Sequence, residues 1–348
     1  MDKLKLITRG LEEVLGLEEL EKLLNEHDLN VYWGTAPTGQ IHFGYFIPMI
    51  KIADFLKANS NVTILFANLH AYLDSMKSTL EQLDHRILYY QKIIQEMFKV
   101  IGVDISKLTF VTGSDFQLSK EYFMDLLKFN TMISIHDALK GGDMVVKQSK
   151  NPKVSSTTYP LMQALDEEYL HCDAQLGGID QIKIFTLAAE HLPKLGYSKR
   201  IHLMNPMLPN FVTPDQKMSS SDPNSKINII DSEKDIRKKI SKAFCEPGNI
   251  ETNPLLMFVK LVIFPIIEHR DFKSFIIDRS EQYGGKIKYL NYEQVENDFR
   301  ELEDGKEYKL SPQDLKLGVS DFMIDILRPI RELADTDEFR SIIKNAYE

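Results

Sequence analysis

The chain has 348 residues, of which 43% are apolar and 27% are charged, and its formal net charge is −9. This composition is typical of an ordinary globular protein with room for two domains, and no run of about 18 apolar residues predicts a transmembrane helix. Two widely separated cysteines, Cys172 and Cys245, argue against a zinc site or a disulfide framework. We therefore expect a protein of the reducing cytoplasm that binds no structural metal.

Short apolar runs alternate with amphipathic stretches after a helical N-terminal segment at residues 4–28. The predicted strands cover residues 31–34, 62–68, 108–112 and 199–204, and the predicted helices cover 46–58, 79–100 and further segments to about 140. This alternation predicts an α/β fold in which a parallel sheet carries helices on both faces. Such a sheet binds ligands at the carboxyl ends of its strands. After Asp231 the pattern is mostly helical.

The segment from Pro37 to Tyr45, with the sequence Pro-Thr-Gly-Gln-Ile-His-Phe-Gly-Tyr, joins the first strand to the helix that follows it. A turn of this kind brings backbone N–H groups and a helix N-terminus toward a nucleotide phosphate. His42 adds a side-chain donor, and Gly44 has no Cβ, so a flat base can approach the backbone closely.

A second polar loop, with the sequence Lys-Met-Ser-Ser-Ser, spans residues 217–221 and carries one lysine suited to closing over a pyrophosphate. Neither segment supplies a base, a nucleophile or a metal cage. Together they indicate a reaction that depends on positioning and on stabilising charge on phosphate.

Two further segments carry candidate binding groups. Tyr159, Gln163 and Asp166 are spaced by four and three residues, which places them on one face of a helix with Pro160 in its first turn. Their side chains could hold an amino acid by its ammonium and its side-chain hydroxyl. The same pattern also describes a helix with a polar solvent face. Residues 177–181, Gly-Gly-Ile-Asp-Gln, form a glycine turn that ends in an acid, which fits a ribose site or a common surface turn.

The first segment and the Lys217 loop resemble the two ATP-binding signatures of class I aminoacyl-tRNA synthetases. Five segments, in the same order along the chain, resemble the tyrosyl-tRNA synthetases of the archaeal and eukaryotic branch: 31–52, 66–74, 159–166, 177–181 and 202–206. In that branch a tyrosine commonly replaces the second histidine of the first signature, as Tyr45 does here, and a serine replaces the second lysine of the closing loop, as Ser221 does.

The resemblance implies a Rossmann-like nucleotide-binding parallel sheet followed by a C-terminal helical anticodon-binding domain. The resemblance implies three parts: an N-terminal helical segment at 1–30, a class I catalytic domain at 31–232 and an anticodon-binding domain at 233–348. The catalytic domain would contain a dimer-forming insert at about 113–160 and the closing loop at 217–221. The implied reaction activates L-tyrosine with ATP, releases pyrophosphate and transfers tyrosine to the 3′-terminal adenosine of tRNA(Tyr). Mg²⁺ would accompany ATP on its phosphate oxygens. We expect no appended RNA-binding domain.

The resemblance also assigns residues to each ligand. Tyrosine would be bound by Tyr32, His70, Gln117, Tyr159, Gln163, Asp166 and Gln181. ATP would be bound by Gly34, Thr35, Pro37, His42, Gly44, Gly178, Asp180, Met204, Lys217 and Met218, and catalysis would involve His42, Gly44, Lys217, Ser219 and Ser220. The tRNA would be bound by Lys140, Lys183, Tyr283 and Asp314.

Asp166 is the residue that would select the substrate. A carboxylate that accepts a hydrogen bond from a phenol is left unpaired by phenylalanine, and rejection by about 10⁴ to 10⁵ is expected; tyrosyl-tRNA synthetase is itself the reference case for this magnitude. The alternatives are a tryptophanyl-tRNA synthetase of the same subclass, a small-molecule nucleotidylyltransferase that shares the first signature, and a non-catalytic RNA-binding homologue.

Three positions depart from the pattern of the branch. Asn68 stands where an aspartate is usual, Ile182 replaces a basic residue associated with the first acceptor-stem pair, and Tyr283 replaces a tryptophan that stacks on an anticodon base. The insert holds a group of apolar residues that would either form a homodimer contact or pack inward: Phe116, Tyr122, Phe123, Leu126, Leu127, Phe129, Met132 and Ile133.

Overall fold

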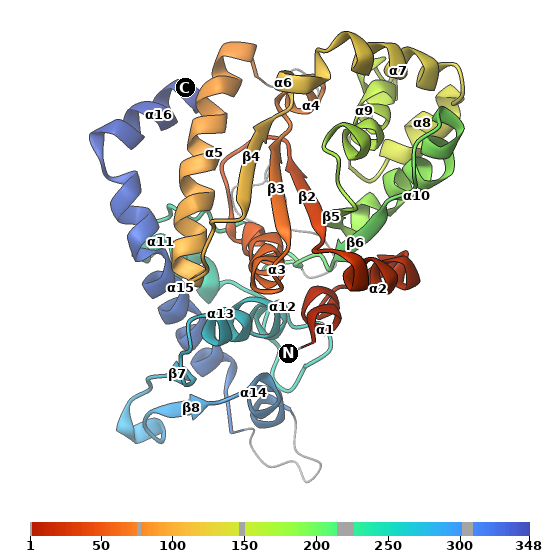
Figure 1. Ribbon diagram of the computed structural model, residues 1–348. Helices are drawn as coiled ribbons and strands as arrows, with labels where there is room; N and C mark the ends of the chain where they lie inside the picture. Colours follow the sequence, from red (N-terminus) through yellow and green to blue (C-terminus); the bar gives the residue numbers. More distant parts are fainter. Residues whose placement is uncertain (1, 75–77, 146–149, 214–225, 301–308) are drawn as a thin grey trace.

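The structure is a computed structural model that describes residues 2–74, 78–145, 150–213, 226–300 and 309–348. Its centre is a six-stranded sheet with the strand order β1-β6-β5-β2-β3-β4, in which all pairs are parallel except β1 with β6 (Figure 1). The strands are β1 (Glu13–Leu15), β2 (Asn30–Thr35), β3 (Asn61–Phe66), β4 (Leu108–Thr112), β5 (Ala174–Gly178) and β6 (Ile201–Asn205). The predicted α/β class with a largely parallel sheet is confirmed.

The sheet is covered on both faces, as strand β2 illustrates. Its successive side chains point to opposite faces. Val31 and Trp33 belong to the main hydrophobic core, whereas Tyr32 belongs to a smaller cluster with Leu65. All four side chains are buried. The helices up to β6 are α1 (Lys3–Thr8), α2 (Leu17–Glu26), α3 (Phe46–Lys57), α4 (Asn68–Leu73), α5 (Leu80–Ile101), α6 (Ser114–Gln117), α7 (Lys120–Asn130), α8 (Ile135–Gly142), α9 (Ser155–Tyr169) and α10 (Ile182–His191).

The N-terminal segment differs from the prediction of one helix over residues 4–28. Helix α1 ends at Thr8, strand β1 pairs antiparallel with β6, and α2 begins at Leu17. Two glycines cause the interruption, because Gly10 and Gly16 have φ angles of 68° and 91°, in the left-handed region that a right-handed helix excludes. The segment therefore extends the central sheet by one edge strand.

The region after residue 230 is mostly helical, as predicted, but it also contains a hairpin that the prediction missed. Its helices are α11 (Glu233–Ser241), α12 (Pro254–Phe258), the π-helical η4 (Val259–Ile263), α13 (Phe264–His269), α14 (Tyr292–Phe299), α15 (Pro312–Ala334) and α16 (Asp337–Tyr347), and its strands are β7 (Phe275–Ile277) and β8 (Ile287–Tyr289). Helix α16 returns to the central domain and packs along α5 (Figure 1). None of the helices described is long and apolar enough to cross a membrane.

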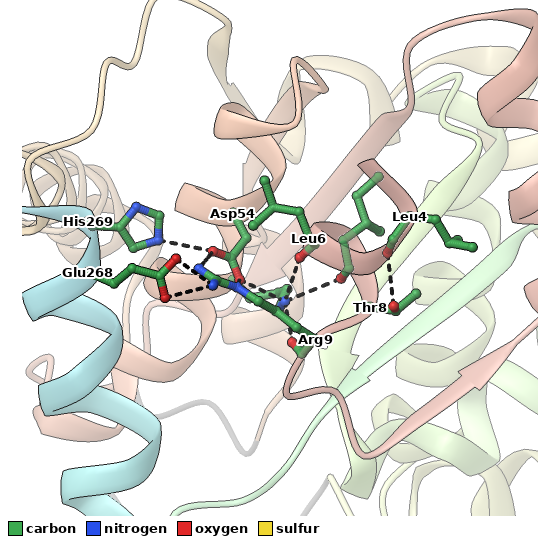
Figure 2. A network of polar contacts seen from close by, with 9 residues as sticks. Leu4, Leu6, Thr8, Arg9, Asp54, Glu268 and His269 are labelled. Carbon is green, nitrogen blue, oxygen red and sulfur yellow. Dashed lines mark hydrogen bonds and ion pairs between the residues drawn. The ribbon is translucent and has the colours of Figure 1, made fainter. Parts of the chain in front are cut away.

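A buried polar network joins the N-terminal segment, helix α3 and helix α13 (Figure 2). Its centre is Asp54, whose two carboxylate oxygens accept hydrogen bonds from Arg9 at 2.5 and 3.0 Å and from His269 at 3.0 Å. Lys51 donates to Asp54 at 2.9 Å and to the Arg9 carbonyl at 2.5 Å, and Arg9 also contacts Glu268 at 2.7 and 2.8 Å. These bonds hold helix α3, which follows the first signature, against the C-terminal region.

Candidate active site

A pocket opens where strands β2 and β5 end, beside the first signature. It lies at the carboxyl edge of the parallel strands, as expected for this fold. The predicted residues that line it are Tyr32, Gly34, Thr35, His42, Gly44, His70, Tyr159, Gln163, Asp166, Gly178, Asp180 and Gln181. Gln175, Gly177, Asn205 and Met207 line it as well. The sequence therefore predicted 12 of the 25 residues that line the pocket, and these 12 come from five separate segments.

His42 caps the short helix η1 (Phe43–Tyr45) at the end of the first signature. Its Nδ1 accepts a hydrogen bond from the Gly44 N–H at 3.1 Å, so the imidazole proton belongs on Nε2, where it can be donated. Burial, together with the nearby charge of Lys226, lowers the pKa of His42 to about 4. The side chain is therefore a neutral hydrogen-bond donor at neutral pH.

The segment that follows the closing loop lies against this signature. His42 forms an antiparallel bridge with Asn228, and the Phe43 N–H donates to the Ile227 carbonyl at 2.9 Å. Lys217, Met218, Ser219 and Ser220 lie outside the described residues. The chain that leads out of the loop is thus fixed beside the predicted phosphate site.

The turn of the first signature is held by side chains that the sequence analysis did not identify. Tyr90 of α5 and Tyr347 of α16 both donate to the Gly39 carbonyl, at 2.7 and 3.0 Å. Arg86 of α5 donates to the carbonyls of Pro37 and Thr38 at 3.3 and 3.0 Å. Because single-sequence patterns do not connect residues about 300 positions apart, the role of Tyr347 had no signal in the sequence.

Helix α9 places Tyr159, Gln163 and Asp166 on the pocket side, as their spacing predicted. The helix begins at Ser155, however, so Pro160 lies inside it and not in its first turn. Gln163 Nε2 donates to Gln181 Oε1 at 2.9 Å. The two amides are therefore fixed relative to each other at the wall of the pocket.

Asp166 lies at the buried end of the pocket, with only 1% of its surface exposed. Gln117 Nε2 and the Tyr122 hydroxyl both donate to its Oδ1, each at 2.8 Å. Burial raises the pKa of Asp166 to about 8, although these two hydrogen bonds oppose the increase. Gln117 does not line the pocket; it contacts the carboxylate from behind.

His70 Nε2 lies 3.7 Å from Asp166 Oδ2. Burial lowers the pKa of His70 to about 4, so the contact joins a neutral imidazole to the carboxyl group and is not an ion pair at neutral pH. The Asp166 carboxyl at the wall of the pocket thus has the neutral side chains of Gln117, Tyr122 and His70 as neighbours.

The predicted ribose turn is the end of strand β5, which the sequence analysis missed. A Cβ on Gly178 would lie 2.5 Å from Asp180 Oδ1 and 3.0 Å from Met207 Sδ. Glycine is therefore required for the Asp180 carboxylate to lie against this backbone. The side chain of Met204 is fully buried in β6 and does not line the pocket, whereas Met207 lines it; the assignment of Met204 to ATP stays a prediction.

The predicted tRNA-binding residues do not line this pocket: Lys140 and Lys183 lie on the neighbouring helices α8 and α10, and the other two lie in the C-terminal region. Lys140 is exposed on α8, and Lys183 of α10 forms an ion pair with Asp143 at 2.6 Å. Tyr283 is 67% exposed beside the β7–β8 hairpin. Asp314 caps helix α15 through Ser311 and lies 3.3 Å from Arg279.

One of the three unusual positions, Asn68, has a clear structural role. It exchanges two 3.0 Å hydrogen bonds with Ser114, and so ties the start of α4 to the start of α6.

In the insert, the group of apolar residues divides into buried and exposed members. Tyr122, Leu126 and Phe129 are buried, Phe116 and Ile133 are partly buried, and Phe123, Leu127 and Met132 are exposed, together with Leu118, Met124 and Ile135. Of the two alternatives for this group, inward packing therefore applies to the three buried residues, and a contact with a second subunit stays a prediction for the exposed ones.

A largely parallel sheet with this signature after its first parallel strand and a polar pocket at its carboxyl edge has the architecture of a class I aminoacyl-tRNA synthetase. The family model described as tRNA synthetases class I (W and Y) matches residues 24–328. The chain belongs to this family.

Named relatives and solved structures agree with that assignment. A protein of Danio rerio named "Tyrosine--tRNA ligase, cytoplasmic" is 50% identical over 346 residues, which are 99% of this chain and 63% of the relative. A Saccharomyces cerevisiae protein of the same name is 49% identical over 348 residues, 98% of this chain and 86% of the relative. The chain thus spans less than two thirds of the vertebrate relative.

Among solved structures, the tyrosyl-tRNA synthetase of Archaeoglobus fulgidus complexed with L-tyrosine is 36% identical, with a TM-score of 0.84 over 95% of this chain and 98% of that one. The tryptophanyl-tRNA synthetase of Giardia lamblia is 16% identical, with a TM-score of 0.67 over 96% of this chain and 86% of that one, and shows the fold alone.

Proposed function

We propose that this protein is a tyrosine–tRNA ligase, which activates L-tyrosine with ATP and transfers it to the 3′-terminal adenosine of tRNA(Tyr). The observation that carries the proposal is the buried Asp166 carboxyl in a pocket that also presents the phenols of Tyr32 and Tyr159 and the amides of Gln163 and Gln181. A carboxylate there accepts the hydrogen bond of a substrate phenol. The names of the relatives support the same substrate.

The amino acid would be held at both ends. Tyr159, Gln163 and Gln181 would take the α-ammonium group, with the Gln163–Gln181 hydrogen bond fixing the two amides. Tyr32 and Asp166 would take the phenol, and Tyr32 is fully buried between the same walls. Holding the substrate in this way leaves its carboxylate directed toward the signature, which lowers the entropy cost of the reaction.

The chemistry is an in-line displacement. The tyrosine carboxylate attacks the α-phosphate of ATP, and the bond to pyrophosphate breaks, which gives tyrosyl-adenylate. His42 donates from its neutral imidazole to the phosphate oxygens, and Asp180 holds the ribose hydroxyls. Lys217 closes over the leaving pyrophosphate. A hydroxyl of the terminal adenosine of tRNA then attacks the tyrosyl carbonyl, and AMP leaves.

Mg²⁺ would arrive with ATP and neutralise charge on its phosphates. In the described ranges no group of three His, Cys, Asp or Glu side chains could hold a metal ion. We propose that phosphate oxygens of ATP hold the ion, as is usual for Mg²⁺ with a nucleotide.

We also propose a homodimer formed through the insert, with the tRNA acceptor stem on one subunit and the anticodon on residues 233–348 of the other. The exposed apolar side chains of α7 and its flanks support the contact: Leu118, Phe123, Met124, Leu127, Met132 and Ile135. Lys140 and Lys183 would contact the acceptor stem, whereas Tyr283 and Asp314 would contact an anticodon base. Sedimentation of the wild type tests the dimer, and a monomer would overturn it.

The substrate proposal is tested by ATP–pyrophosphate exchange with each of the standard amino acids. Tyrosine alone should drive exchange, and charging of tRNA(Tyr) should follow. Preferential exchange with tryptophan would favour the tryptophan enzyme of the same family, and exchange without any amino acid specificity would overturn the role of Asp166.

A further inference from the structure

Tyr122 is a buried phenol that lies behind Asp166 and does not line the pocket. None of its surface is exposed, and its hydroxyl lies 2.8 Å from Asp166 Oδ1 and 2.9 Å from the Met162 carbonyl oxygen. Gln117 donates to the same Oδ1 at 2.8 Å. Oδ1 therefore accepts the hydrogen bonds of both Gln117 and Tyr122. Among the described residues, Oδ2 has His70 as its neighbour at 3.7 Å, so Oδ2 can accept a hydrogen bond from a ligand.

We propose that Tyr122 is a positioning residue for substrate selection, whose hydroxyl holds Oδ1 of Asp166 so that Oδ2 accepts the hydrogen bond of the substrate phenol. This inference rests on the proposed function of the pocket. It adds a residue that touches neither tyrosine nor ATP.

The hydroxyl of Tyr122 has one proton and two possible acceptors. When Asp166 is ionised, the carboxylate is the stronger acceptor, because hydrogen bonds to a charged group are stronger than those to a carbonyl. When Asp166 is protonated, the Tyr122 hydroxyl can instead donate its hydrogen bond to the Met162 carbonyl, and the carboxyl group can donate a hydrogen bond to the Tyr122 oxygen. The phenol therefore favours the ionised acid that reads the substrate.

The protonation of Asp166 matters because the groups around it are neutral or negative. The titratable groups that face it are Tyr32 of β2, His70 of α4, Tyr122 of α7, and Tyr159 and Glu167 of α9. His70 is neutral, and the charge of Glu167 disfavours a second negative charge. Removal of the Tyr122 hydroxyl removes one of the two hydrogen bonds that oppose a higher pKa.

A role in packing alone can be separated from this one. The Tyr122 ring contacts Phe116 and Tyr169, with ring centroids 5.8 and 4.8 Å apart, and phenylalanine would keep both contacts. Tyr169 offers a matched control. Its ring packs directly against the ring of Tyr122, but its hydroxyl donates to Asp125 at 2.8 Å and not to Asp166.

The test compares Tyr122→Phe with Tyr169→Phe in ATP–pyrophosphate exchange, using tyrosine and phenylalanine from pH 6.5 to 9.0. In Tyr122→Phe we expect KM for tyrosine to rise about 10-fold or more, with kcat little changed, because a hydrogen bond to a charged acceptor is lost. Exchange with phenylalanine should be unaffected, so the tyrosine-to-phenylalanine ratio falls by the same factor. The pH at which tyrosine binding reaches half its maximal strength should move upward. Tyr169→Phe should match the wild type in ratio and in pH profile.

Calorimetry of tyrosine binding in two buffers gives a readout that does not depend on activity. At pH 8 the variant should release more protons per bound tyrosine than the wild type, because more of its Asp166 starts protonated. A wild-type ratio and pH profile in Tyr122→Phe, equal losses for both amino acids, or the same shift in Tyr169→Phe would overturn the inference. A wild type that does not prefer tyrosine would instead overturn the proposed function, whatever the variants do.

Discussion

Two buried aspartates, Asp54 and Asp166, have similar exposure and opposite electrostatics. Each exposes no more than 2% of its surface. Burial alone raises the pKa of both, but hydrogen bonds from His269 and Arg9, with the charge of Lys51, hold the pKa of Asp54 well below its usual range. Burial raises the pKa of Asp166 to about 8, because the hydrogen bonds that oppose the increase come from neutral donors, Gln117 and Tyr122.

The difference follows from what each carboxylate contacts. Asp54 is surrounded by side chains that use both of its oxygens, so it is ionised at neutral pH and joins three parts of the chain (Figure 2). Asp166 keeps one oxygen toward the pocket, where the proposed substrate would bind. A buried carboxylate that is fully paired stabilises the fold, whereas one with an open side and a raised pKa indicates a binding site.

The largest expected effect comes from the removal of the selecting carboxylate. Asp166→Ala should lower the tyrosine-to-phenylalanine ratio of kcat/KM by about 10³-fold or more, because the site loses the group that penalises the missing hydroxyl. The measurement is ATP–pyrophosphate exchange with both amino acids. A ratio that stays at the wild-type value would show that another group selects the substrate.

The pH dependence of the wild type sharpens the same point. Since the ionised form binds the phenol and the pKa of free Asp166 is about 8, KM for tyrosine should fall as the pH rises from 6.5 and level off above about 8. KM for phenylalanine, measured over the same pH range, is the control for titration of the amino acid itself, and it should not show the fall expected for tyrosine. A flat tyrosine profile would contradict the raised pKa.

Asp54→Asn should affect stability and not selection. The change leaves Lys51 and Arg9 without their buried partner, and removal of one member of a buried ion pair costs about 3–5 kcal/mol. Urea unfolding should show this loss, while the tyrosine-to-phenylalanine ratio of the folded enzyme stays at the wild-type value. Because the folded pKa is depressed, the contribution of Asp54 is present above about pH 4 and is lost in the wild type as the pH falls further toward the folded pKa. The variant should lack this part of the acid transition.

His42→Ala tests a third kind of polar group, a neutral donor at the phosphate end of the pocket. We expect kcat of exchange to fall by about 10²- to 10³-fold, as for the loss of one preorganised donor, with the selection ratio unchanged. Since the pKa of His42 is about 4, the imidazole does not titrate between pH 6.5 and 9.0, and the pH profile of the variant should keep the wild-type shape. A change of selectivity would place His42 in the wrong part of the site.

Local patterns in the sequence predicted the parts of this molecule that depend on neighbouring residues. The strands at 31–34 and 108–112 and the helices at 46–58 and 79–100 agree with the structure within about two residues at each end. Spacing alone placed Tyr159, Gln163 and Asp166 on one helix face. Strand β5 was missed because its last residues, Gly177 and Gly178, have the composition of a turn.

The remainder depends on contacts between distant segments. The environment of Asp54 is built from three segments of the chain and that of Asp166 from five elements, and no pattern in one of them indicates the others. Tyr122 was grouped with apolar surface residues because a phenol in a hydrophobic helix has no sequence mark of a buried hydrogen bond. The outcome is general: polar networks between segments cannot be read from one chain without its fold.

The smallest expected effect tests the outer edge of the Asp54 network. Glu268 forms an ion pair with Arg9, but its side chain is 44% exposed, so water screens the interaction. Glu268→Gln should therefore lower the free energy of unfolding by about 0.2–1 kcal/mol, the usual range for exposed pairs, because Arg9 keeps both hydrogen bonds to Asp54. Urea unfolding at low and high salt measures the change, and Glu96→Gln, which breaks the exposed Lys99–Glu96 pair on α5, is the matched control. If Glu268→Gln lowered the free energy of unfolding as much as Asp54→Asn, the stabilising centre of the network would be the Arg9–Glu268 pair. The conclusion that the fully paired Asp54 stabilises the fold, in contrast to Asp166, would then be wrong.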